Sequence, residues 1–112
     1  SGAIDGTTIG AASATTGAFT NLTASGTLGV TGVATFATHA VFGDSDIIKL
    51  GAGTDLQIYH DGTNSYVANA TGALKVATET SGIAVTIGHT TSETTIADNA
   101  SITGDLLLEI LQ

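Results

Sequence analysis

The chain contains no cysteine, proline, tryptophan or methionine among its 112 residues. Without cysteine, no disulfide can strengthen a small core, and no thiol can act as a nucleophile or a metal ligand. Without proline, every backbone N–H after the first residue can donate to a sheet ladder. These absences exclude a disulfide scaffold and thiol chemistry, and they leave β structure open to the whole chain.

Basic residues are almost absent. Lys49 and Lys75 stand against ten acidic residues, and the formal net charge is −8. Nucleic-acid binding needs cationic side chains that replace the counterions of the phosphates, so we expect no nucleic-acid partner. There is also no run of 18 apolar residues, so we expect no membrane insertion.

Large apolar residues are too few for a self-sufficient core. Leu, Ile, Val and Phe together number 28 of the 112 residues, and the only other aromatic residues are two tyrosines. Small domains bury a smaller share of their surface and are marginal alone. We therefore expect other copies of the chain to complete the core.

The composition favours an all-β fold of short Thr/Gly-rich strands and hairpins. Thr is β-branched and suits strands, while the 15 Gly residues punctuate them with turns. Apolar residues alternate over 27–42, 83–87 and 102–110, and a further strand is expected at 71–76. A weak repeat, Thr-Gly-x-apolar-x-apolar, occurs at 31–36, 71–76 and 103–108.

Two N-terminal stretches are less defined. Residues 4–10 are predicted to form a short β-turn-β element with Asp5 and Gly6 in the turn. Phe19 and Leu22, three residues apart, fit either one helical turn or the two sides of a bend.

The clearest local signal is a hairpin within residues 51–67. Apolar and polar residues alternate over 56–59, as in a half-buried strand. Asp61 and Gly62 follow directly, and both tolerate the backbone conformations of tight turns. The sequence therefore predicts two antiparallel strands joined at this dipeptide.

The register of this hairpin has two alternatives. A two-residue turn places Leu56 opposite Val67, whereas a four-residue turn places Tyr59 opposite Tyr66. We favour the second, because an aromatic cross-strand pair contributes roughly 0.2–1 kcal/mol.

The three histidines are the obvious metal candidates. On a three-fold axis, one inward-facing histidine per chain would bring three ring nitrogens together. None of His39, His60 and His89 belongs to a His-x-His pair, so the chain does not supply the two histidines per copy that six ligands on the axis would need. We therefore interpret all three as surface or turn residues. We expect no metal ion and no other cofactor.

Other motifs fail at required positions. The calcium-like start at 44–46 continues with Ile48 and Lys49, where an oxygen ligand and a glycine are needed. The glycines at 51 and 53 have no third glycine at Leu56. No serine lies in a nucleophile elbow. We expect no enzyme activity.

The chain resembles a known family along nearly its whole length. Residues 41–46 leading into 51–66 resemble repeated segments of tail-fibre-like virion proteins of bacteriophages, especially those infecting marine bacteria and cyanobacteria. Two flanking stretches, residues 4–10 through 17–23 and residues 88–96 through 102–106, resemble the repeats of fibre shafts. The apolar end at 106–112 departs from the Thr/Val/Asn/Gly-rich strand expected there.

The resemblance implies an elongated, intertwined homotrimeric β fibre within a virion. The expected segments are a shaft-like part at 1–40, a hairpin module at 41–76 and a second shaft-like part at 77–112. The chain would assemble in the bacterial cytoplasm, join other virion tail proteins, and act extracellularly as a rod presenting a receptor-binding tip.

Two sets of residues are candidates for contacts. Tyr59, His60 and Tyr66 would touch a host surface glycan if the segment itself were a glycan-binding module. These two roles, the fibre segment and the glycan-binding module, are the first two hypotheses. A non-viral surface adhesin or self-assembling filament is the third. The predicted trimer core consists of Leu28, Val30, Phe36, Leu56, Ile58, Ile83, Val85, Ile87, Ile102, Leu106, Leu108 and Ile110.

Overall fold

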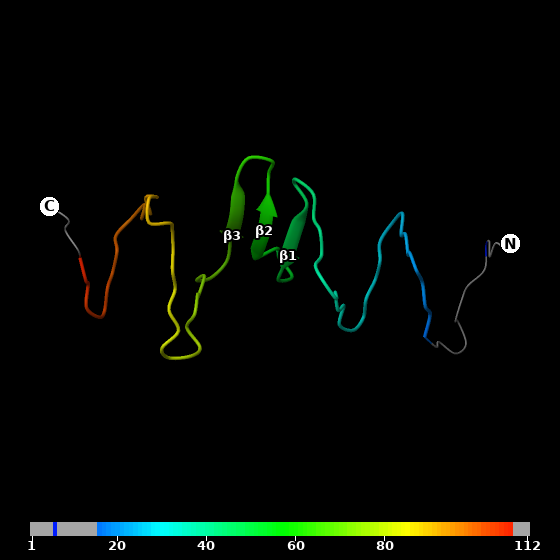
Figure 1. Ribbon diagram of the computed structural model, residues 1–112, viewed down its shortest axis with the longest axis horizontal. Coiled ribbons are helices and arrows are strands. Elements are labelled where there is room, and N and C mark those ends of the chain that lie inside the picture. Colours follow the sequence, from blue (N-terminus) through cyan, green and yellow to red (C-terminus); the bar gives the residue numbers. More distant parts are fainter. Residues whose placement is uncertain (1–5, 7–15, 109–112) are drawn as a thin grey trace. The chain divides into compact units, whose positions relative to one another are not determined.

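The computed structural model describes residue 6 and residues 16–108, and the chain divides into two units, Ser1–Val41 and Phe42–Gln112. The described residues contain no helix. Their strands are β1 (Ile47–Leu50), β2 (Leu56–His60) and β3 (Ser65–Asn69), shown in green in Figure 1. They form one antiparallel sheet in the order β1-β2-β3, which agrees with the all-β prediction.

The β2–β3 hairpin has the register favoured from the sequence. Tyr59 pairs with Tyr66 and His60 pairs with Ser65, so four residues, 61–64, connect the strands. The two-residue alternative, with Leu56 opposite Val67, is wrong because Leu56 pairs with Asn69.

Strand β1 was not assigned from the sequence. Its register places Ile48 opposite Ile58 and Leu50 opposite Leu56, so aliphatic side chains meet across the ladder. The connection to β2 turns at Gly51, where φ is +88° and the carbonyl accepts a hydrogen bond from the Thr54 amide at 3.3 Å. Glycine adopts this left-handed conformation without Cβ strain.

The pairing gives the sheet two chemically different faces. Directly paired residues share a face, and neighbours along a strand alternate between faces. We call one the aliphatic face: it carries Ile48, Leu50, Leu56, Ile58 and Val67, and ends in His60, Ser65 and Asn69. We call the other the aromatic face: it carries Ile47, Lys49, Gln57, Tyr59, Tyr66 and Ala68.

The other predicted strands are absent from the single chain, and their formation between chains stays a prediction. Residues 27–42, 71–76 and 102–108 contain bends and irregular backbone, residues 83–87 contain irregular backbone alone, and no strand lies in any of these ranges. An alternating segment becomes a strand only when another strand satisfies its backbone groups, and β1, β2 and β3 pair with one another alone. The stretch 109–110 lies outside the described residues.

The N-terminal predictions have separate outcomes. Phe19 and Leu22 flank a bend at Thr20, so the bend and not the helical turn is present. Gly6 has a φ of +66°, as a turn glycine can, but the rest of the predicted element at 4–10 lies outside the described residues.

None of the described residues is buried. The half-buried ones all lie in or beside the sheet, among them Leu56, Gln57, Tyr59 and Ala68. Outside the sheet, the residues predicted to form a trimer core are exposed, as for Phe36 at 64% and Val85 at 49%. Their place in an interior shared between chains stays a prediction, as does the division at residues 40 and 76, and Ile110 lies outside the described residues.

No helix in the described part of the chain has the length and apolar character needed to cross a membrane.

Candidate functional site at the hairpin tip

The four-residue turn at 61–64 is organised by the side chain of Asp61. Its Oδ1 accepts hydrogen bonds from the backbone N–H of Thr63 at 2.9 Å and of Asn64 at 2.8 Å. The Asp61 N–H in turn donates to the Asn64 carbonyl at 3.0 Å. Gly62, at φ +96°, supplies the left-handed residue that the turn requires. The carboxylate thus satisfies backbone donors that have no ladder partner.

Asp61 also reaches the aromatic face. Its Oδ2 accepts a hydrogen bond from the Tyr66 hydroxyl at 3.0 Å. The backbone N–H groups of Asn64 and Thr63, followed by this hydroxyl and by the nearby His60, hold the pKa of Asp61 below its ordinary value of 3.8. Each donor favours the ionised form, so the carboxylate remains a charged acceptor in neutral and mildly acidic solution.

The two tyrosines form a stacked pair beside this turn. Their ring centroids are 4.8 Å apart and their planes differ by 17°. Tyr59 is half-buried on the central strand, while Tyr66 is 37% exposed on the edge strand. Because the Tyr66 hydroxyl donates to Asp61, the hydrogen bond links the turn at 61–64 to the stacked rings and restricts the position of both.

His60 lies on the opposite face from the tyrosines. Its Nδ1 and the Ser65 Oγ are 2.9 Å apart, and the two residues are directly paired across the strands. The three residues predicted to contact a receptor are therefore close in sequence and in space, yet divided between faces. Their role in such a contact stays a prediction.

The segment before β1 closes over the same end of the sheet. The Ser45 N–H donates to the His60 carbonyl at 2.7 Å. The Gly43 N–H donates to Asp46 Oδ2 at 2.8 Å, and the Asp46 N–H donates back to the Gly43 carbonyl at 3.2 Å. This reciprocal pair makes 43–46 a turn.

Metal-binding groups do not gather in the described residues, which contain no cluster of three or more His, Asp or Glu side chains suited to an ion. His89 sits in its own turn, where its Nδ1 is 2.9 Å from Thr91 Oγ1. His39 lies in the first unit, apart in sequence from the other two.

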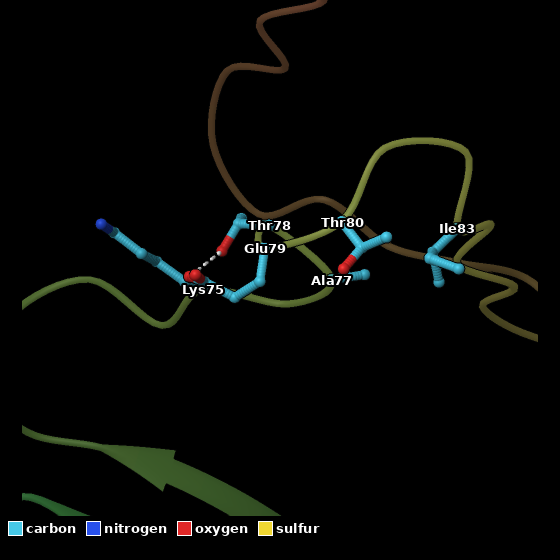
Figure 2. Close-up of a pocket in the computed structure, with 6 residues that line it drawn as sticks. All are labelled: Lys75, Ala77, Thr78, Glu79, Thr80 and Ile83. Carbon is cyan, nitrogen blue, oxygen red and sulfur yellow. Dashed lines mark hydrogen bonds between the residues drawn. The ribbon is translucent and has the colours of Figure 1, made fainter.

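A second feature is an open hollow of about 340 Å³ in the segment 75–83 (Figure 2). It is lined by Lys75, Ala77, Thr78, Glu79, Thr80 and Ile83. The Thr78 hydroxyl donates to Glu79 Oε1 at a long 3.5 Å, and the Lys75 ammonium points away from these two groups.

Comparison of the chain with protein-family models, with curated protein sequences and with solved structures finds no match.

Sequence reasoning found the tyrosine pair but missed two features of this region. The bond between Asp61 and Tyr66 depends on side-chain geometry that the turn motif does not specify. The contribution of Ile48 and Leu50 to the sheet was indicated only by a four-residue run, 47–50, with three large aliphatic residues. So short a run does not distinguish a strand from other structure.

Proposed function

We propose that the chain is a structural segment of a phage tail fibre or a similar virion appendage. Three copies would intertwine into an acidic β rod that holds a receptor-binding tip away from the virion, in contact with other tail proteins. The role is mechanical, and catalysis and cofactors have no part in it.

The observation that supports association is the exposure of the apolar side chains. None of the described residues is buried, and large apolar residues are exposed from Phe19 to Leu108. Ordering one residue costs roughly 1–2 kcal/mol of backbone entropy, and complete burial of an aliphatic side chain returns about 1.5–3 kcal/mol. A chain that buries so little does not recover this cost alone, and this supports a core completed by contacts with other chains.

The fibre role, as opposed to association in general, is supported by composition and resemblance. The Thr/Gly-rich alternating segments can enter sheets between chains, and no proline interrupts their ladders. The run at 41–46 and 51–66 resembles phage fibre repeats. With ten acidic residues and two basic ones, such rods would carry a net negative charge, and the repulsion between them would oppose aggregation.

The test is the mass of the native particle, measured by light scattering coupled to size exclusion over a range of concentrations. We expect three times the chain mass of 11.0 kDa. Val85→Asp places a charge in a predicted core row and should dissociate the particle, while Thr86→Asp, one residue on, should leave the mass unchanged. A folded monomer of the wild-type chain would contradict the proposal.

A second candidate function is glycan binding by the hairpin tip. The observation that favours it is the pre-ordered tyrosine pair, because aromatic rings suit stacking on sugar faces and Tyr66 is 37% exposed. A glycan array distinguishes this role: binding that is lost in Tyr66→Ala would support it, and the absence of any binding would exclude it.

A further inference from the structure

The aliphatic face of the sheet is a continuous apolar surface. Ile48, Ile58 and Val67 form one row across all three strands, and Leu50 and Leu56 form the next. No charged residue lies on this face. On the opposite face, the row next to the tyrosines is Lys49, Gln57 and Ala68, which is mostly polar.

The side chains of this face are only partly covered. Ile48 is 38% exposed, Leu50 46%, Ile58 42% and Val67 58%. An antiparallel sheet normally packs its more apolar face against another layer, and here that is the face without a charged residue. Within the described residues, no strand or helix supplies such a layer.

The area and charge of the face indicate its occupant. Exposed fractions near one half leave roughly 300–400 Å² of apolar surface, within the ~300–600 Å² range of the largest patches on monomers, which are often functional. This is below the ~800 Å² that each partner buries in a stable interface, so the face would be one part of a longer contact. A second copy provides an equally apolar, uncharged face together with the other exposed apolar side chains, whereas a charged partner would find no counter-charge here.

We propose that the aliphatic faces of the three copies turn toward their common axis, so that each packs against the same face of its neighbours at about the 10 Å distance that packed sheets adopt. The proposal rests on the proposed function, since it assigns the hairpin's contact within the assembly. It adds Ile48, Leu50 and Val67 to the shared interior and leaves the aromatic face, with its tyrosines, turned to solvent.

The absence of cysteine allows a direct test in the full chain. Val67→Cys and Ala68→Cys are matched variants, because the two positions are adjacent on β3 and lie on opposite faces. Each is treated with a bis-maleimide that spans about 10 Å, and covalent dimers are counted on a denaturing gel. Reactivity with a monovalent maleimide is measured in parallel on the native particle and after unfolding.

We expect covalent dimers from Val67→Cys and almost none from Ala68→Cys, at an unchanged particle mass. The Val67→Cys thiol should react with the monovalent maleimide at least tenfold more slowly in the particle than after unfolding, so crosslinking is followed until this slow reaction is complete. If the wild-type chain assembles but the Ala68→Cys variant crosslinks instead, the docking face is wrong while the proposed function stands. A wild-type monomer overturns both. A thiol at position 67 that is protected in a monomer would mean that the chain's own residues cover the face, and would also overturn the proposal.

Discussion

The stacked pair of Tyr59 and Tyr66 should measurably stabilise the hairpin, and a double-mutant cycle can isolate its contribution. The cycle compares the wild-type chain with Tyr59→Leu, Tyr66→Leu and the double variant. Each single substitution removes the stack but keeps an apolar side chain in the strand. The difference between the double variant and the sum of the single variants is the coupling free energy of the rings.

The geometry sets the expected size of this coupling. A centroid separation of 4.8 Å lies within the favourable range for aromatic pairs, and the interplanar angle of 17° indicates near-parallel stacking. Aromatic pairs contribute about 0.5–1.5 kcal/mol beyond the area they bury, and cross-strand pairs in general about 0.2–1 kcal/mol. Because Tyr66 is 37% exposed, we expect a coupling of about 0.5–1 kcal/mol in favour of the closed hairpin.

Native-state amide hydrogen exchange of the β2–β3 ladder is the suitable assay, because it reports the free energy of local opening. A coupling of this size changes the exchange rate about two- to fivefold, since 1.4 kcal/mol corresponds to a factor of ten. Tyr66→Phe keeps the ring but removes the hydroxyl bond to Asp61, and so separates the two effects.

The matched control is a cycle on Gln57 and Ala68, which pair on the same face without aromatic rings. Its coupling should be close to zero. If the tyrosine cycle gives no more coupling than this control, the stack does not hold the hairpin and the reasoning fails.

Two further predictions concern the turns. The pKa of Asp61 is lowered in the folded chain, so its contribution to stability is complete above the ordinary value of 3.8 and is lost as the pH falls through the lower, folded-state value. The near-ultraviolet circular dichroism of the two tyrosines, in a chain without tryptophan, should therefore fall in this acid range, and a wild-type-like fall in Asp61→Asn would contradict the assignment. Gly51→Ala should destabilise the β1–β2 connection by about 1–2 kcal/mol, because φ is +88° and the added Cβ would collide with the Asp55 carboxylate. Hydrogen exchange of the β1–β2 ladder measures this loss of stability. Gly104→Ala is the control, because the Cβ added there meets nothing within 4 Å. Equal effects of the two substitutions would refute the argument.

The hairpin was predictable because its determinants are local. The alternation at 56–59 defines β2, and Asp61 with Gly62 supplies both the cap and the left-handed residue of the turn. The register also followed from the sequence, since the four-residue turn allows the two tyrosines to meet. The hydrogen bond from Tyr66 to Asp61 was not predictable, because it depends on where the turn places a carboxylate that already accepts two backbone amides.

Strand β1 and the division of the sheet into two faces needed the structure. A run of four residues has no measurable period, so Ile47–Leu50 carried no assignment until its pairing with β2 was known. The faces then follow from the register alone. The converse holds at 27–42 and 83–87, where a clear alternation predicts strands and the single chain forms none.

The contrast between the segments that pair and those that do not is explained by the cost of closing loops. Strands β2 and β3 are joined by four residues and β1 and β2 by five, so each pairing closes a short loop that its own turn residues stabilise. The alternating segments at 27–42 and 83–87 have the side chains of strands but no partner strand across such a turn. Pairing between chains needs no turn at all, and its cost depends on concentration instead. In the proposed fibre, the hairpin would therefore be the part that each chain forms for itself, and the flanking segments would become strands only as the copies assemble.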